Sequence, residues 1–288
     1  MLLGAPAPSL EKATVLTRLK WLEPFRPVVV ELVRVVSEDE VKFHEIAQLI
    51  RSDAAVSAEV LRIANSPLLG SWGRVNSVLH AVVMLGLERL KGLVLTLTLR
   101  NSLSRALEVP ALLRCWRHNL ACGVLSEHLA GMYFLPKDPC FTAGLLHDVG
   151  RLALLGSFPS EYVEALKLAD HYNLDMLECE RGVFGLDHCE AGEWLVEKWG
   201  FPEEFRQITG RHHEEPSAGR LDKLALVGIS CRMADALGFM AAGSVPQDGF
   251  SRLAARLPVP GWHRVLSETE LSVAIADKIN ALECGLLE

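Results

Sequence analysis

Apolar residues recur along this chain at intervals of three and four residues, the spacing of an α-helix with one buried face. The pattern is clear over residues 28–36, 46–50 and 56–63, whereas the strict alternation that marks a half-buried strand is rare. The patterned segments end at proline, glycine or asparagine, as helices commonly do. The pattern therefore predicts an all-α fold, a bundle of many helices.

Later in the chain the same spacing predicts helices at about 110–133, 139–155, 159–171, 173–184, 188–199, 202–213, 219–240 and 263–284. Segment 87–99 is rich in leucine and β-branched residues, and its periodicity alone also fits a buried strand. We interpret this segment as a helix because its neighbours are helical and no partner strand is evident. Asn65-Ser66-Pro67 predicts a helix stop, and Ser77 predicts the N-cap of a helix that begins at Val78.

Histidines are distributed unevenly, which suggests where the chemistry lies. Only His44 and His80 precede a loose boundary near residues 100–110, and eight of the ten histidines follow it. We therefore predict two parts: residues 1–105, an N-terminal helical lobe, and residues 106–288, a helical lobe that includes the C-terminal helices. Any chemistry is expected in the second lobe.

Composition narrows the possible classes of function. Half of the 288 residues are hydrophobic and 23% are charged, so the chain can form a globular core. A formal net charge of −7 argues against a broad surface for nucleic acid or for an anionic membrane. The N-terminal segment does not resemble a signal peptide, and no apolar run is long enough to span a bilayer. Seven cysteines without a C-x-x-C pair indicate reduced thiols, and we expect a cytoplasmic protein.

One set of polar residues in the second lobe has the chemistry of a metal site. Adjacent residues on a helix point about 100° apart, so a neighbouring histidine and aspartate can reach one metal only at a helix end, or else bind two metals. Imidazole nitrogens together with carboxylates suit iron, manganese, zinc or nickel rather than calcium. The candidate ligands are His118, His147, Asp148, His188, His212, His213 and Asp235.

Several motifs in the same order carry a resemblance to a known family, and they span about residues 18–215. The motifs are Ile50-Arg51-Ser52-Asp53-Ala54-Ala55-Val56 with Val60-Leu61-Arg62-Ile63-Ala64-Asn65-Ser66, Ala81-Val82-Val83-Met84-Leu85-Gly86, Cys115-Trp116-Arg117-His118, Gly144-Leu145-Leu146-His147-Asp148-Val149-Gly150-Arg151-Leu152, Leu186-Asp187-His188-Cys189-Glu190-Ala191-Gly192 and Lys198-Trp199-Gly200-Phe201-Pro202. With the paired histidines that follow, the chain resembles the HD superfamily of metal-dependent phosphohydrolases. It resembles most closely HDOD, the HD-related output domain of bacterial signalling proteins.

The resemblance implies an HD-like helical bundle and a ligand set. His118, His147, Asp148 and Asp235 match the core HD metal site, and His188, His212 and His213 match the extra ligands of HD-GYP phosphodiesterases, so one or two divalent transition metals (iron, manganese, zinc or nickel) are expected. The chain departs from the pattern at three places. Arg151 stands where lysine is usual, Arg114 stands where some HD-GYP proteins have an acidic residue, and Glu214-Glu215-Pro216 replaces the Gly-Tyr-Pro signature. The two glutamates are expected to repel a phosphodiester.

The resemblance favours one function and leaves others open. HDOD domains are mostly regulatory, so we expect a signal-transduction module that acts through a signalling protein partner, with little or no catalysis and no direct contact with nucleic acid or membrane. The alternative is a phosphohydrolase of cyclic dinucleotides or nucleotides, in which Asp148 and Arg151 would be catalytic. A sensor that binds such a ligand without cleaving it is a third hypothesis. The remaining hypothesis is a decayed site without metal, in which the histidines form hydrogen bonds with one another and with the backbone. Cys122 and Cys189 are expected to be small buried hydrophobes.

Overall fold

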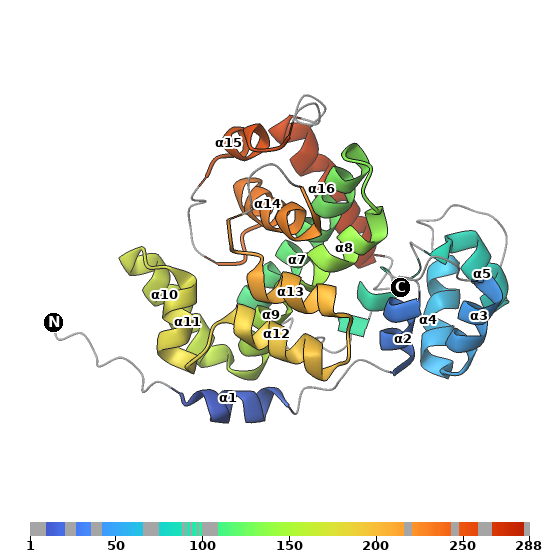
Figure 1. Ribbon diagram of the computed structural model, residues 1–288, viewed down its shortest axis with the longest axis horizontal. Helices are drawn as coiled ribbons and strands as arrows, with labels where there is room; N and C mark the ends of the chain where they lie inside the picture. Colours follow the sequence, from blue (N-terminus) through green and yellow to red (C-terminus); the bar gives the residue numbers. More distant parts are fainter. Residues whose placement is uncertain are drawn as a thin grey trace.

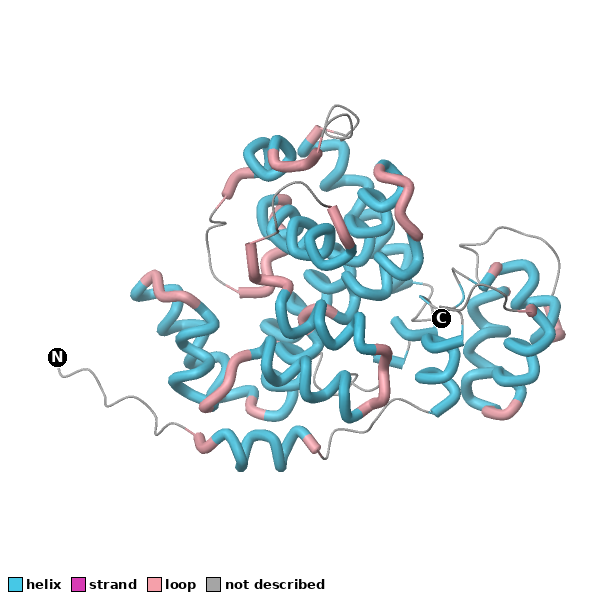
Figure 2. The backbone as a smooth tube through the Cα atoms, viewed as in Figure 1, coloured by secondary structure: helices cyan, strands magenta, loops and turns pink. Residues whose placement is uncertain are grey.

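The computed structural model describes residues 10–20, 27–35, 42–65, 75–87, 90, 92, 94–96, 98–99, 109–215, 221–242, 248–258 and 267–284. These residues form helices and connecting turns without any strand, which confirms the all-α prediction (Figure 2). The described residues between 87 and 99 are helical, as predicted. The predicted lobe boundary near residue 105 lies outside the described residues.

The helices follow one another with short connections. In chain order they are α1 (Lys12–Leu19), α2 (Pro27–Val35), α3 (Phe43–Arg51), α4 (Ala54–Ala64), α5 (Val78–Leu85), α7 (Pro110–Met132), α8 (Lys137–Leu146), α9 (Val149–Ser157), α10 (Pro159–Tyr172), α11 (Met176–Phe184), α12 (His188–Lys198), α13 (Glu203–Arg211), α14 (Lys223–Ala236), α15 (Phe250–Ala255) and α16 (Glu268–Cys284). As predicted, α4 stops at the Asn65 C-cap and Ser77 is the N-cap residue of α5.

Two groups of helices are visible in Figure 1. Helices α2 to α5 lie together at one end of the molecule, and the remaining helices surround α7. The long helix α7 packs against α8, α14, α16 and α9, and side chains are buried on all of its faces, as expected for a helix at the centre of a bundle. The buried apolar side chains of both groups form one connected core. The first histidine of the candidate site therefore stands at the centre of this core.

Helix α1 was not predicted, and it packs on the second lobe although it lies within residues 1–105. Its neighbour is α9, and the backbone N–H of Leu10 donates to the carbonyl of Val183 at 2.6 Å. Lys12 forms an ion pair of 2.6 Å with Glu190 of α12. The first residues of the described chain thus cover the elements that carry the candidate site.

The predicted helix 139–155 is wrong in one respect: it is two helices, because the chain turns at His147 and Asp148. Helix α8 ends at Leu146, and α9 begins at Val149 with Asp148 as its N-cap residue. The imidazole Nδ1 of His147 bonds the carbonyl of Gly144 at 2.6 Å, which satisfies a carbonyl group at the end of α8. The turn places the adjacent histidine and aspartate at a helix end, the geometry that lets both face one site.

Other boundaries differ from the predictions for local reasons. Helix α13 ends at Arg211, so that His212 and His213 lie beyond its last turn. Helix α11 begins only at Met176, because Asn173 is left-handed and the Asp175 side chain caps the new helix by accepting from the N–H of Glu178. The short helix α15 was not predicted, and α14 is shorter than the predicted 219–240.

Helices α9 and α12 approach each other through two glycines. A Cβ atom built on Gly150 would lie 2.0 Å from the carbonyl oxygen of His188 and 2.4 Å from the backbone nitrogen of Gly192. Only glycine permits this approach, since the obstructing atoms belong to the backbone. The contact brings the start of α12, which carries His188, beside Asp148.

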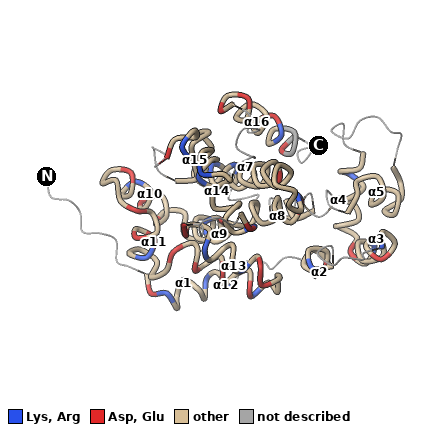
Figure 3. The backbone as a smooth tube through the Cα atoms, turned by 45° about the horizontal axis from the view of Figure 1, so that its top comes forward, with Lys and Arg blue, Asp and Glu red and all other residues tan. Residues whose placement is uncertain are grey.

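The surface carries charges of both signs. In Figure 3, lysine and arginine segments alternate with aspartate and glutamate segments along α3, α10 and α11. The exposed pairs between neighbours, such as Glu164 and Lys167 at 2.6 Å, contribute at most about 1 kcal/mol each. None of the helices in the described part of the chain combines the length and the apolar character that crossing a membrane requires.

Candidate metal centre

Five of the seven predicted ligands converge in the interior of the larger group of helices. The five side chains come from four places: α7, the turn between α8 and α9, which supplies two of them, the first residue of α12 and the turn after α13. Every one of them is at most 1% exposed. We call His118, His147, Asp148, His188 and His212 the buried cluster.

His118 is held at both ring nitrogens. Its Nδ1 lies 2.7 Å from the carbonyl oxygen of Phe239 and 3.3 Å from Oδ1 of Asp235. Because a carbonyl oxygen only accepts, Nδ1 carries a proton, and Nε2 is the ring nitrogen that remains for another ligand. That Nε2 lies 3.5 Å from Sγ of Cys231. Asp235, which is partly exposed, therefore contacts the ring nitrogen on the side away from Cys231.

Three acceptor atoms converge without hydrogen-bond partners. Nδ1 of His147 donates to the carbonyl of Gly144, and Nδ1 of His212 donates to the carbonyl of Thr209 at 3.1 Å, so that Nε2 of each ring is an acceptor. Both Nε2 atoms and Oδ1 of Asp148 are buried and have no hydrogen-bond partner. One ligand atom from each of these three residues lies within 4.8 Å of the others.

We call the His147, Asp148 and His212 atoms the acceptor triad. Buried polar atoms in proteins nearly always have partners, and three converging acceptors repel one another unless a cation lies between them. Two imidazoles and one carboxylate are the donor set of many iron, manganese and zinc sites. The residues present therefore fit the divalent transition metal that the sequence predicts.

The protonation states of the acceptor triad favour a cation. Burial lowers the pKa of His147 well below its usual value and that of His212 to about 3, so both rings are neutral at pH 7. Burial alone would raise the pKa of Asp148, but the charge of Arg151 and the nearby histidines hold it well below its usual range. Neutral imidazoles and an ionised carboxylate are the forms that bind metals.

Arg151 occupies the other side of Asp148. Its Nε donates to Oδ2 of Asp148 at 2.5 Å, and its Nη2 donates to Nε2 of His188 at 3.1 Å. Nη1 lies 3.2 Å from the Tyr162 hydroxyl and 3.6 Å from Oε1 of Glu180. The guanidinium is buried and keeps its proton at any physiological pH. The fixed positive charge of Arg151 thus already satisfies Oδ2 of Asp148 and Nε2 of His188.

Glu180 and Tyr162 belong to this site, although the sequence analysis did not identify them. Oε2 of the fully buried Glu180 accepts from Nδ1 of His188 at 2.6 Å and from its backbone N–H at 2.8 Å, and Oε1 accepts from the Tyr162 hydroxyl. Glu180 lies four residues before Phe184, on the buried face of α11. A glutamate on the apolar face of an amphipathic helix was the signal that could have revealed it.

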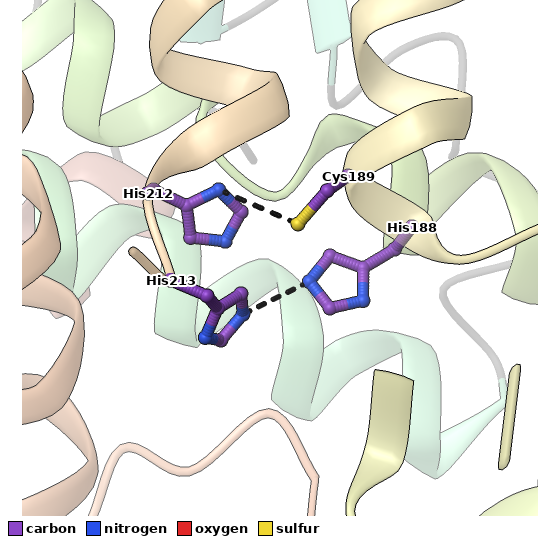
Figure 4. A group of neighbouring side chains, drawn as sticks. All are labelled: His188, Cys189, His212 and His213. Carbon is purple, nitrogen blue, oxygen red and sulfur yellow. Dashed lines mark hydrogen bonds between the residues drawn. The ribbon is translucent and has the colours of Figure 1, made fainter. Parts of the chain in front are cut away.

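His213 is the exposed neighbour of the buried cluster. Figure 4 shows the rings of His212 and His213 facing His188 and Cys189 across the gap between α13 and α12. Nε2 of His213 lies 3.0 Å from Nε2 of His188, and Sγ of Cys189 lies 4.0 Å from Nδ1 of His212. The N–H at Nδ1 of His212 already donates to the carbonyl oxygen of Thr209, so the Cys189 thiol can at most share this hydrogen. His213 therefore lies beside the buried cluster, at its rim.

The two glutamates after the paired histidines are neutralised by arginines. Glu214 pairs with Nη2 of Arg211 at 2.7 Å, and Glu215 pairs with Nη1 of Arg232 at 3.0 Å. The expected repulsion of a phosphodiester is therefore offset in part by positive charge nearby. Burial of the cluster, rather than these glutamates, limits access to it.

Comparisons with known proteins agree with this fold. The chain is a helical bundle with a buried cluster of histidines and an aspartate. The family model of the HDOD domain matches residues 22–215, and the chain belongs to the HDOD family.

Solved structures show the same fold. An HDOD domain protein of unknown function from Geobacter sulfurreducens is 22% identical, with a TM-score of 0.69 over 96% of this chain and 98% of that chain. A candidate signal transduction protein from Marinobacter aquaeolei VT8 is 18% identical, with a TM-score of 0.73 over 96% of this chain and 65% of that one. A candidate phosphohydrolase from Shewanella amazonensis SB2B is 21% identical, with a TM-score of 0.64 over 95% and 97%.

A longer relative is similar in sequence. An uncharacterised protein of Treponema pallidum (strain Nichols) is 23% identical over 209 residues, which are 72% of this chain and 40% of that protein. The chain therefore spans less than half the length of this relative.

Proposed function

We propose that this protein is a regulatory HDOD module of bacterial signal transduction that acts through a signalling protein partner. In this proposal its buried cluster binds one divalent transition metal ion and does not hydrolyse phosphodiesters. The observation that carries the proposal is the position of Arg151, whose guanidinium satisfies Asp148 and His188 on the side where a second metal ion would bind.

The ion pair of Arg151 leaves room for one metal position. A second ion held by Oδ2 of Asp148 and by Nε2 of His188 would compete with the positive charge of Arg151, which deprotonation cannot remove. The acceptor triad includes the other oxygen of Asp148, Oδ1, which has no hydrogen-bond partner and lies 3.2 Å from Nε2 of His188. When bound there, a metal ion would supply the positive charge that the three acceptors lack.

The same residues explain how such a site would serve regulation. His147 and Asp148 form the turn between α8 and α9, His212 follows α13, and His118 lies on α7. A common ligand would join elements that are far apart in the sequence, and occupancy would therefore change the stability of their packing. The partner would recognise that change.

Burial supports regulation rather than turnover. Hydrolysis requires the phosphodiester to reach the metal-bound oxygen and groups that hold the substrate. The residues of the buried cluster are at most 1% exposed, and the arginine of the site points at protein atoms instead of solvent. Nothing in these contacts holds a phosphate.

The experiment is an activity screen of metal-loaded protein against cyclic dinucleotides and nucleotide monophosphates. We expect wild-type turnover to equal that of Asp148→Asn, which removes the ligand charge without changing the shape of the side chain. Asp277→Asn, an exposed change on α16, serves as the matched control. Turnover that Asp148→Asn abolishes and Asp277→Asn retains would contradict the proposal and establish the phosphohydrolase.

A further inference from the structure

Helix α14 presents two side chains to the same imidazole. Cys231 and Asp235 are four residues apart and therefore lie on one face of the helix. Sγ of Cys231 lies 3.5 Å from Nε2 of His118, whereas Oδ1 of Asp235 lies 3.3 Å from Nδ1 of the same ring. The resemblance to HD proteins assigns the ligand on this helix to Asp235, but the side chain at Nε2, the nitrogen that does not bond the Phe239 carbonyl, is Cys231.

His147 completes a second group of donors around this thiol. One ligand atom each of His118, His147 and Cys231 lies within 4.8 Å of the other two, and all three residues are buried. The Nε2 of His147 has no hydrogen-bond partner, although its side chain is fully buried. His147 also belongs to the acceptor triad, so this thiol adjoins the metal position already proposed.

We propose that Cys231 supplies the ligand from α14 as a thiolate, and that Asp235 is a positioning residue that holds the His118 ring. This inference rests on the metal site of the proposed function. Binding replaces one proton: the Cys231 S–H bond breaks, the proton passes to solvent, and sulfur bonds to the ion together with Nε2 of His118. No oxidation or reduction takes part.

The chemistry of the donors identifies the class of metal. Thiolate together with imidazole selects zinc over manganese or magnesium, which prefer oxygen. Zinc–nitrogen bonds of about 2.0 Å and zinc–sulfur bonds of about 2.3 Å give a nitrogen–sulfur separation of about 3.5 Å in a tetrahedral site. The separation of 3.5 Å between Cys231 and His118 equals this value. The predicted cofactor is therefore zinc.

Two other cysteines provide matched controls. Cys189 lies 4.0 Å from Nδ1 of His212, a nitrogen that already donates to the carbonyl of Thr209. Cys122 is buried on α7, and its Sγ contacts the carbonyl oxygen of Val227 at 3.8 Å. Cys189 also belongs to a group with His188, His212 and His213 whose ligand atoms lie within 4.8 Å of one another, so Cys189→Ser tests this competing group and Cys122→Ser is the control outside both groups.

The experiment is a cobalt(II) titration of the metal-free full-length protein, followed by its absorption spectrum. A cobalt–thiolate bond gives a near-ultraviolet charge-transfer band that nitrogen and oxygen ligands do not give. We expect the band in wild type, Cys189→Ser, Cys122→Ser and Asp235→Asn, and its loss in Cys231→Ser. Zinc affinity, measured against a chromophoric chelator, should fall at least about 10-fold in Cys231→Ser and about 10- to 100-fold in Asp235→Asn.

The outcomes separate this inference from the proposed function. A full band in Cys231→Ser, or a band lost in Cys189→Ser, would overturn the thiolate assignment and leave the metal site standing. Absence of cobalt binding by wild type would overturn both. If Cys231→Ser does not fold, X-ray absorption of zinc-loaded wild type decides: one sulfur at about 2.3 Å supports the assignment, and a shell of nitrogen and oxygen alone overturns it.

Discussion

Replacing Arg151 by methionine is expected to destabilise the metal-free protein by about 3–5 kcal/mol, because the change leaves a buried carboxylate without its counter-charge. Asp148 is 1% exposed, and the guanidinium is the group that holds its Oδ2. The same change removes a donor from His188. Urea denaturation of wild type and Arg151→Met, both free of metal, measures the difference in the free energy of unfolding.

Variants that remove one or both charges show whether the loss of the ion pair causes the destabilisation. Asp148→Asn combined with Arg151→Met should be more stable than Arg151→Met alone, since the double change removes both charges. Added metal should stabilise Arg151→Met more than wild type, because the ion then replaces the missing positive charge. A loss of less than about 1 kcal/mol in Arg151→Met, the range of an exposed pair, would mean that the ion pair does not determine the site.

The second large effect is expected from Gly150→Ala, which should prevent stable folding or lower the free energy of unfolding by more than about 3 kcal/mol. The added Cβ would lie 2.0 Å from the carbonyl oxygen of His188 and 2.4 Å from the backbone nitrogen of Gly192, both on α12. Helices α9 and α12 would have to separate, because backbone atoms cannot move aside as a side chain can, and such overpacking is strongly destabilising. Thermal denaturation followed by circular dichroism measures the effect.

Gly182→Ala is the control for the loss of glycine itself. Gly182 lies inside α11, and a Cβ at this position meets nothing within 4 Å. The change should stabilise the protein by about 0.5–1 kcal/mol, since alanine favours a helix over glycine. Equal stability of Gly150→Ala and wild type would contradict the close approach of α9 and α12.

The sequence predicted the helical fold well, because most helices have an apolar face and end at proline, glycine or a capping residue. The predicted helix range 139–155 ran through the turn at His147 and Asp148, since apolar residues continue on both sides of it and periodicity alone does not register a break of two residues. The bond from His147 to Gly144 that accompanies the break is a local contact of side chain and backbone. Such a contact leaves no periodic signal.

The candidate site was predictable in its residue types but not in its geometry. The family resemblance implied that the histidines and Asp148 share a site, and five of them do converge, although order along the chain could not show it. The sequence could not indicate which nitrogen of His118 each residue of α14 would face, since Cys231 and Asp235 lie on the same side of the helix. Glu180 was missed for a similar reason: its role appears only when α11 meets α12.

We propose that the buried cluster binds one metal ion and that the guanidinium of Arg151 occupies the position of a second ion. The most direct measurement is the number of metal ions per chain, by mass spectrometry of the full-length protein purified without chelator and after reloading with zinc, manganese, iron or nickel. We predict one equivalent in wild type and none in the double variant His147→Ala, Asp148→Ala. Two equivalents in wild type would contradict the role of Arg151, and none after reloading would contradict the metal site.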